Sequence, residues 1–414
     1  MTTSTSELPT ECFVWVWLPG AAEPVVAGRL SQVGVTYRFA YGRSYLGRAD
    51  AISLYAPELP LRQGWVDPRD GMEMAGCLWD ASPDSWGQRV IIARLTGDLD
   101  NRLDRTSFGR LTFLVESGSN RIGGLDFQTS ATQYVPRSES ATLDELHEAA
   151  DALMAGELTP ALAAALVDGT AVGGARPKVL ISDGGREYIA KLSTSDDRVS
   201  EVKAEAVCME LARLAGLEVP DTHLTRSLGR EVLLVERFDR PGAGQRRLMV
   251  SALTMQGYGD FLGARYSSYP DMLDVLLKHA ATSGALPSRL FRRIVFNVAI
   301  GNIDDHARNH SAFWDGQHLE LTPAYDLCPQ PRTAREVNQA MMIGRDGSRS
   351  SQFSTCVAAA GDYGLTVNEA TSVVAEVVDT IRTHWVDVCD THELSQVDRT
   401  ALLGVRVLNP YAFD

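Results

Sequence analysis

Residues 12–60 carry short runs in which apolar and polar positions alternate. The runs CFVWVWL, PVVAGRL and VTYRFAY are separated by Gly and Pro, which predicts a small antiparallel sheet or partial barrel. The next stretch, SPDSWGQRVIIARLTG, begins with a Ser or Asp that can cap a helix. It then places Trp86, Val90, Ile91 and Leu95 at helical spacing, so we expect a helix there.

The pattern changes around residues 119–143, which are polar and rich in Ser and Thr. The Ala-rich stretch that follows, TLDELHEAADALMAGELTPALAAALV, has a helical pattern that stops at Gly169. After a Gly-rich turn come two β runs, 179–182 and 188–192, joined by the hairpin signal SDGG. SEVKAEAVCMELARLAGLEVP then reads as an amphipathic helix with a Gly stop, and EVLLVERFDR as a strand.

Beyond about residue 245 the chain is predicted to be mainly helical, apart from loops around 302–310. The pattern divides the chain into a small β-rich part with helices (1–140), a helix followed by a β-rich lobe (141–240) and a helical lobe (241–414). This order of a glycine turn, a hairpin, a helix, a strand and a helical half is that of a bilobal kinase. We therefore expect an α+β fold.

Composition limits the function classes. The chain has 414 residues, 44% of them hydrophobic, enough for two or three globular units. A net charge of −14 argues against direct binding to nucleic acid, so any association with DNA would need a basic partner. The six cysteines show no C-x-x-C pair and predict reduced thiols. No apolar run reaches ~18 residues and no signal peptide is recognisable, which predicts a cytoplasmic protein without membrane contact.

The densest polar stretch is NIDDHARNH at residues 302–310, directly after the apolar run IVFNVAIG. Asp304 and Asn309 are five positions apart, as in the kinase catalytic loop D-x-x-x-x-N. In that interpretation Asp304 accepts the proton of the substrate hydroxyl and Asn309 binds Mg²⁺. Asp326, in LTPAYDLCP, follows a short β-like run and is the candidate for a second magnesium-binding side chain.

Two residues upstream complete a kinase set. Lys191 alternates with apolar neighbours in YIAKL, so its ammonium group can emerge on one strand face and bind phosphates. Glu205, in the next helix, is the expected ion-pair partner. His306 is expected to orient the loop by hydrogen bonding. The same residues also allow purely structural roles, and His306 with His310 allows an i, i+4 metal pair.

The sequence resembles the HipA-like serine/threonine kinases, which act as toxins in bacterial toxin–antitoxin pairs. The resemblance depends on VGGARPK, YIAKL, AEAVCMELARLAGLEVP, LLVERFDR, GNIDDHARNHSAFW and LTPAYDL, in this order from about 170 to 330. The first ~115 residues are similar to the family's N-terminal subdomain. The resemblance implies a bilobal, kinase-like fold with ATP and Mg²⁺ as cofactors.

The resemblance also implies roles for individual residues. Asp304 is the catalytic aspartate, and Asn309 and Asp326 are the Mg²⁺ ligands. The residues implied to bind ATP are Lys191 with its partner Glu205, the hinge residues Glu236 and Phe238, His306, and the phosphate-side loop of Val172, Gly173, Gly174, Ala175 and Lys178.

Partners and regulation follow from the same resemblance. The family phosphorylates a Ser or Thr of a translation component such as an aminoacyl-tRNA synthetase, and a helix-turn-helix antitoxin neutralises it and carries it to DNA. Family members commonly have a regulatory serine before the phosphate-side loop. Here the aligned position is Ala171, and the adjacent Thr170 is the candidate for autophosphorylation.

Competing interpretations stay open at this point. A small-molecule kinase of the aminoglycoside or choline type shares the D-x-x-x-x-N spacing, although its histidine usually precedes the aspartate, whereas His306 follows Asp304. An inactive pseudokinase acting as a binding partner or co-repressor is the alternative that is not an enzyme. A metal hydrolase using the two histidines is the third.

Overall fold

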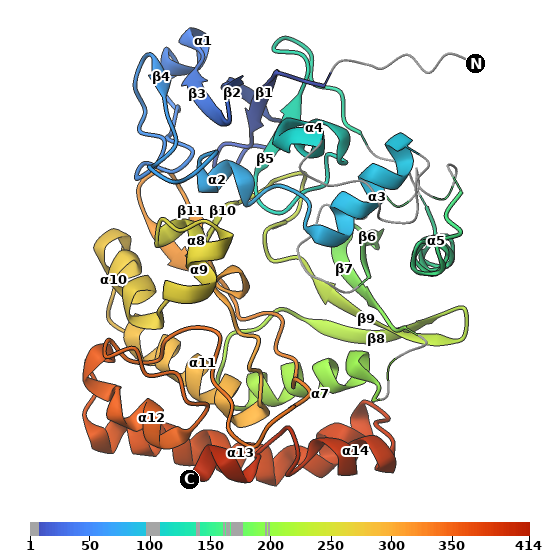
Figure 1. The fold of residues 1–414 in the computed structure, drawn as a ribbon, viewed down its shortest axis with the longest axis vertical. Coiled ribbons are helices and arrows are strands. Elements are labelled where there is room, and N and C mark those ends of the chain that lie inside the picture. Colours follow the sequence, from blue (N-terminus) through green and yellow to red (C-terminus); the bar gives the residue numbers. More distant parts are fainter. Residues whose placement is uncertain are drawn as a thin grey trace.

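The computed structural model describes residues 8–96, 108–137, 141–159, 162, 166, 177–194, 197 and 199–414. In these residues the chain forms three antiparallel sheets and a helical C-terminal half, arranged along one long axis (Figure 1). Each part of the predicted division at about 140 and 240 contains one of the sheets. The boundaries themselves stay predictions.

The N-terminal sheet has the strand order β4-β3-β2-β1-β5 in the described residues. In β3 the buried residues Tyr37, Phe39 and Tyr41 alternate with less buried ones, as expected of a sheet with one face in the core. The elements here are β1 (Glu11–Val16), β2 (Val25–Val33), β3 (Thr36–Tyr41), α1 (Arg43–Leu46), β4 (Trp65–Val66), α2 (Gly76–Trp79), α3 (Ser85–Thr96), α4 (Gly109–Glu116) and β5 (Leu125–Gln128). Strand β5 lies inside the polar stretch that the sequence suggested as a boundary.

The middle sheet has the order β6-β7-β9-β8 in the described residues. Its elements are α5 (Leu143–Ala155), β6 (Lys178–Asp183), β7 (Arg186–Leu192), α7 (Glu201–Leu214), β8 (Thr222–Ser227) and β9 (Arg230–Glu236). The predicted hairpin is confirmed, with Gly184 and Gly185 at positive φ in the turn. The prediction of one continuous helix from 142 to Gly169 is wrong, because α5 ends where Gly156 adopts φ +74°.

Helix α7 packs against both halves of the molecule. Val202 and Ala206 contact Leu233 and Val235 of the middle sheet, whereas other residues of α7, including Met209, belong to the core of the C-terminal half. Helix α3 covers the same sheet through Trp86, which is fully buried in a cluster with strand residues of β6, β7 and β9. The N-terminal part and helix α7 therefore both position the middle sheet.

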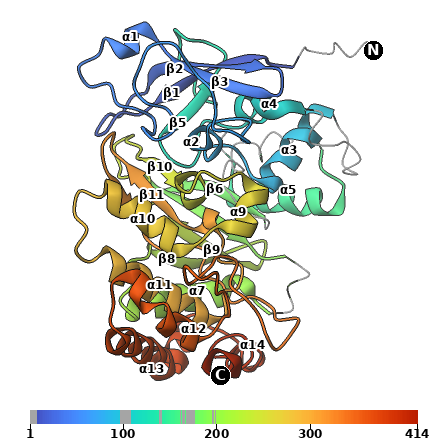
Figure 2. The same ribbon diagram turned by 60° about the vertical axis from the view of Figure 1, so that its left-hand side comes forward.

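The C-terminal half contains the small sheet β10-β11-β12 and most of the helices. Its elements are β10 (Leu248–Ser251), α8 (Ala252–Met255), α9 (Asp260–Tyr266), α10 (Tyr269–His279), α11 (Leu286–Ile300), η2 (Ala307–Asn309), β11 (Ser311–Trp314), β12 (Leu319–Leu321), α12 (Phe353–Ala358), η3 (Ala360–Tyr363), α13 (Val367–Thr391), α14 (Gln396–Leu402) and η4 (Pro410–Phe413). Figure 2 shows α13 and α14 at the end of the long axis opposite the N-terminal sheet.

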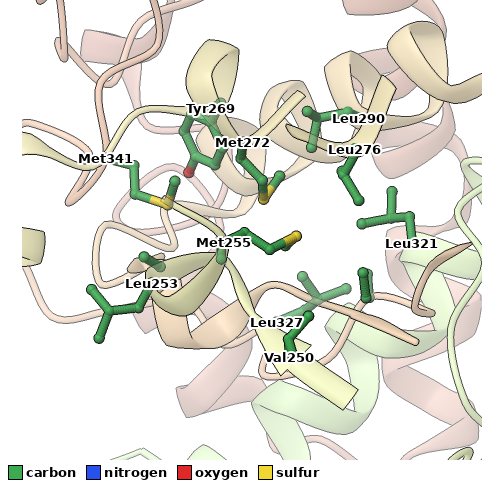
Figure 3. Packing of buried hydrophobic residues seen from close by; sticks show 14 of the residues in the cluster. Val250, Leu253, Met255, Tyr269, Met272, Leu276, Leu290, Leu321, Leu327 and Met341 are labelled. Carbon is green, nitrogen blue, oxygen red and sulfur yellow. The ribbon is translucent and has the colours of Figure 1, made fainter. Parts of the chain in front are cut away.

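One apolar core joins the first and last parts of the chain. It runs from Cys12 in β1 to Ala412 near the C-terminus, and Figure 3 shows its region around Met255 and Met272, where side chains from strands β10 and β12 and helices α8, α10 and α11 meet. The six cysteines are unpaired, and all except the half-buried Cys328 are buried. Within the described residues no helix is both long and apolar enough to cross a membrane.

Candidate active site

A buried ion cluster joins three of the predicted site residues. The Lys191 ammonium on β7 lies 2.5 Å from Glu205 Oε1 on α7 and 2.6 Å from Asp326 Oδ1 in the loop after β12. The side chains of Lys191 and Glu205 are 17% and 7% exposed, whereas that of Asp326 is 39% exposed. The cluster thus links the middle sheet, helix α7 and the C-terminal half, and its open side is at Asp326.

The pKa values in this cluster follow from burial and pairing. Burial alone would lower the pKa of Lys191, but Asp326 and Glu205 outweigh it and raise that pKa. Lys191 is also the main reason that the pKa of Asp326 lies well below its usual value. Burial raises the pKa of Glu205, and Lys191 opposes this effect. Asp326 is therefore a carboxylate at neutral pH and can bind a cation.

Lys178 adds a second ammonium group beside the first. It is paired with Lys191 across β6 and β7, so both side chains point to the same face of the sheet. Burial lowers the pKa of Lys178, with Lys191 acting in the same direction and Asp326 opposing both. Two lysines next to one ionised carboxylate form a site that suits the phosphates of a nucleotide and a divalent cation.

The catalytic-loop candidate begins where α11 ends at Gly301, which adopts φ +70°. Asp304 is exposed, and its carbonyl oxygen accepts hydrogen bonds from the backbone N–H of His306 at 2.8 Å and from Asn309 Nδ2 at 3.2 Å. Partial burial raises the pKa of Asp304, and the charges of Asp326 and Asp305 add to this, whereas His306 opposes it. Because Asn309 uses its nitrogen within the loop, its amide oxygen is the atom that can bind a metal.

Asp305, to which no chemistry was assigned, is the structural anchor of this loop. Its buried Oδ2 accepts hydrogen bonds from Tyr269 Oη at 2.5 Å, Asn297 Nδ2 at 2.7 Å and His310 Nε2 at 2.9 Å. His306 was predicted to organise the loop by hydrogen bonding, and its buried Nδ1 has no partner among the described residues, so this role stays a prediction. His310, four positions later, does bond within the loop through its contact with Asp305.

A second set of bonds ties the loop to Asp326. Asn302 Nδ2 donates to Asn297 Oδ1 at 3.0 Å and to the carbonyl oxygen of Asp326 at 3.2 Å. Asp326 has φ +59°, a left-handed conformation that Asp tolerates better than most residues. Sequence reasoning missed Asn297, Asn302 and Tyr269. The one available signal was the asparagine inside the apolar helix pattern FNVAI, because a buried amide needs partners.

The neighbouring aspartates lead to opposite predictions. Asp305→Ala leaves three buried donors without an acceptor, so we expect the free energy of unfolding to fall by about 2–4 kcal/mol. Asp304→Ala removes an exposed carboxyl and should change it by less than about 0.5 kcal/mol. Urea unfolding of both variants and the wild type measures the difference. Equal losses in the two variants would contradict the anchor role of Asp305.

The predicted hinge residues lie where the chain leaves β9 for β10. Glu236 ends β9, its backbone N–H donates to the Asp221 carbonyl at 2.9 Å, and its carboxylate accepts from Arg186 Nη1 at 2.9 Å. The Phe238 ring packs against the rings of Phe313 and Tyr325, each at a centroid distance of 5.8 Å. Phe238 thus offers a half-buried aromatic surface between the two lobes.

The remaining predicted residues, Thr170, Val172, Gly173, Gly174 and Ala175, lie outside the described residues, as does Ala171. Asp84, the helix-cap candidate, accepts a hydrogen bond from Gly87 N–H at 2.8 Å at the start of α3. Burial raises the pKa of Asp84 to about 6, although this N–H and the Lys178 ammonium act against it. Asp84 therefore contributes to the field around Lys178, a role that the sequence did not indicate.

The donor set fits Mg²⁺ better than a transition metal. Among the described residues no group of three or more His, Cys, Asp or Glu side chains could hold a metal. Asp326 and Asn309 supply oxygen atoms, and Mg²⁺ commonly takes one or two carboxylates together with phosphate oxygens and water. The His310 Nε2 atom is taken up by a hydrogen bond with Asp305, which counts against its use in a His306–His310 metal pair.

Comparisons with known proteins give a consistent result. A family model described as the HipA-like C-terminal domain matches residues 170–385. "Putative kinase Y4mE" of Sinorhizobium fredii is 30% identical over 30% of this chain and 31% of its own length. "Serine/threonine-protein kinase toxin HipA" of Shewanella oneidensis is 25% identical over 38% of this chain and 42% of its own length. The chain thus spans only about a third to two fifths of the length of these relatives.

A solved structure covers more of the chain. HipA of Shewanella oneidensis, in a complex with HipB and operator DNA, superposes with a TM-score of 0.68 and 19% identity over 95% of both chains. At this identity the similarity shows the fold. The bilobal α+β architecture expected from the sequence is therefore confirmed, including the β-rich N-terminal part.

Proposed function

Because the chain belongs to the HipA-like C-terminal domain family, we propose that it is an ATP- and Mg²⁺-dependent protein serine/threonine kinase and the toxin of a toxin–antitoxin pair. The observation that carries this proposal is the ion cluster of Lys191, Glu205 and Asp326 beside the loop of Asp304. A kinase needs a lysine–glutamate pair, a metal-binding aspartate and a proton-accepting aspartate together, and these residues meet that need.

In the proposed reaction the protein mainly positions groups and balances charge. Lys191 and Lys178 neutralise phosphate oxygens, and Glu205 keeps the Lys191 ammonium in place. Asp304 accepts the proton of the attacking Ser or Thr hydroxyl. Asn309 and Asp326 would hold Mg²⁺, which when bound neutralises the charge spread over the phosphate groups.

The nucleotide is proposed to lie between the lobes. Backbone groups of the hinge around Glu236 and Phe238 would receive the adenine, with the Phe238 ring against it. His306 and the loop of Val172, Gly173, Gly174 and Ala175 would lie on the phosphate side, next to Lys178. The support is the position of Phe238 between β9 and β10 and the electrostatic interaction of His306 with both Asp304 and Asp326.

The proposed partners are a protein substrate, such as an aminoacyl-tRNA synthetase, and a cognate helix-turn-helix antitoxin. The solved relative was found in a complex with HipB and operator DNA, and the net charge of −14 fits a protein that reaches DNA only through such a partner. Thr170 is the proposed site of regulatory autophosphorylation. Phosphopeptide mass spectrometry after incubation with ATP tests it, since an unmodified Thr170 would exclude that role.

Growth inhibition tests the proposed function. Wild-type protein expressed in a host without the antitoxin should arrest growth, and Asp304→Ala should not, although both accumulate to the same level. Equal inhibition by the two would exclude a kinase mechanism. A small-molecule kinase would instead phosphorylate a metabolite, and a pseudokinase would show no thermal shift with ATP and Mg²⁺ or would bind without transfer.

A further inference from the structure

The loop that carries Asn309 has one ionic contact with a residue outside the kinase lobes. Arg308, directly before Asn309, has its guanidinium 3.5 Å from Asp80 Oδ1, and Asp80 follows α2 in the N-terminal part. The Arg308 Nε and Nη2 atoms also donate to Asp260 Oδ1 at 2.9 and 2.6 Å. The Asp80 side chain is only 11% exposed and that of Asp260 is 64% exposed. Solvent therefore screens the contact with Asp260 far more strongly.

Asp80 is itself fixed to the C-terminal half. Its Oδ2 accepts from Ser251 N–H at 2.8 Å and its Oδ1 from Ser251 Oγ at 2.7 Å. Ser251 caps α8 and is paired with Ser311, two positions after Asn309, in the β10–β11 ladder. The Asp80 carboxylate thus contacts Arg308 directly, on one side of Asn309, and is linked to Ser311 on the other side through Ser251.

The approach of α2 to α8 leaves little freedom at this junction. A Cβ atom added to Gly76 in α2 would lie 2.5 Å from Thr254 Oγ1 in α8, so only glycine allows this contact. Six residues after Asp80, Trp86 is fully buried against the middle sheet. Residues 80–86 therefore connect the two lobes. Asp80 contacts Arg308 of the catalytic loop, and Trp86 packs in the core under the middle sheet.

We propose that Asp80 is a positioning residue for phosphoryl transfer. It holds Arg308, and through Arg308 the loop with Asp304 and Asn309, in the geometry that the reaction requires. The other side of the loop supports this arrangement, because Tyr325 Oη donates to the carbonyl oxygen of Arg308 at 2.9 Å. The N-terminal part then contributes a residue that positions the catalytic loop. This inference rests on the proposed kinase function.

The experiment compares Asp80→Asn, Arg308→Gln and the double variant in the full-length chain. The new amide can keep both bonds to Ser251, because the Ser251 hydroxyl can accept as well as donate, so the fold is preserved. The Asp80 charge that faces Arg308 is lost, whereas that of the exposed Asp260 remains. We expect kcat to fall about 10- to 100-fold while KM for ATP changes by less than about threefold. The double variant should be no worse than Arg308→Gln alone, because that substitution already breaks the contact with Asp80 as well as the one with Asp260.

A control and a second readout separate the possible results. Asp274→Asn removes a surface carboxylate that pairs with Arg345 at 2.9 Å, and it should leave kcat unchanged. Hydrogen exchange of residues 302–311 without nucleotide should be faster in Asp80→Asn than in the wild type. The exchange measurement needs no enzymatic activity. If the wild type transfers no phosphate, the proposed function is refuted, but exchange still tests whether Asp80 holds the loop. Unchanged kcat, unchanged exchange or additive losses in the double variant would overturn the positioning role.

Discussion

Asp304→Asn is expected to lower kcat for phosphate transfer by about 10²–10⁴-fold, with ATP affinity nearly unchanged. The carboxylate accepts a proton only as the new bond forms, and nucleotide binding depends on other groups. Because the side chain is exposed and the buried anchor belongs to Asp305, the fold should be unaffected. Steady-state kinetics, together with the melting temperature of wild type, Asp304→Asn and the surface control Asp274→Asn, measure the effect.

The pH dependence provides a further check on Asp304. Partial burial and neighbouring carboxylates raise its pKa above the usual 3.8, and only the deprotonated form accepts a proton. Activity should therefore fall as pH is lowered through this raised pKa and be full above it. A variant with the wild-type kcat, or a rate that increases on acidification, would show that Asp304 is not the proton acceptor.

Lys191→Met should abolish transfer and also destabilise the protein. It removes the ammonium that binds phosphates, and it leaves Glu205, only 7% exposed, without its partner. Removing one member of a buried ion pair usually costs about 3–5 kcal/mol. We expect a loss near the lower end at pH 7, because the partly exposed Asp326 retains contact with water.

The pH dependence of the stability loss in Lys191→Met distinguishes an unpaired Glu205 from a general folding defect. Without Lys191, burial raises the pKa of Glu205 further, so the folded variant binds a proton more tightly than the unfolded chain. Its deficit in unfolding free energy should therefore shrink as pH falls and be largest at neutral pH. The double variant Lys191→Met/Glu205→Gln should recover part of the loss. Urea titrations at pH 5 and pH 7 test this, and a pH-independent deficit that the second substitution leaves unchanged would contradict it.

Much of the fold followed from local patterns. The three N-terminal strands, the SDGG hairpin and helix α7 with its Gly stop each depend on periodicity and turn residues that lie within one segment. Strands β8 and β10 were missed because the short runs THLTRS and LMVS become strands only by pairing with β9 and β11. The break in the predicted long helix was missed because Gly156 stands among strong helix formers.

The site residues also divide into those that local sequence predicted and those that it did not. Spacing and residue type indicated Lys191, Glu205 and Asp326, and the structure brings these three together. Several of the residues that hold the loop were not predictable, because their partners are distant in sequence. Asp80 bonds to Ser251, 171 residues away, and Asp305 to Tyr269, 36 residues away. Such roles depend on tertiary contacts that no local spacing encodes.

The most direct measurement of the central claim is transfer of the γ-phosphate of labelled ATP to protein. The full-length chain is incubated with labelled ATP, with or without Mg²⁺, in a bacterial extract, and phosphoserine and phosphothreonine are counted. We predict label on protein Ser or Thr that requires Mg²⁺ and is absent with Asp304→Asn. Label that persists with Asp304→Asn, label found only on small molecules, or no label despite bound ATP would contradict it.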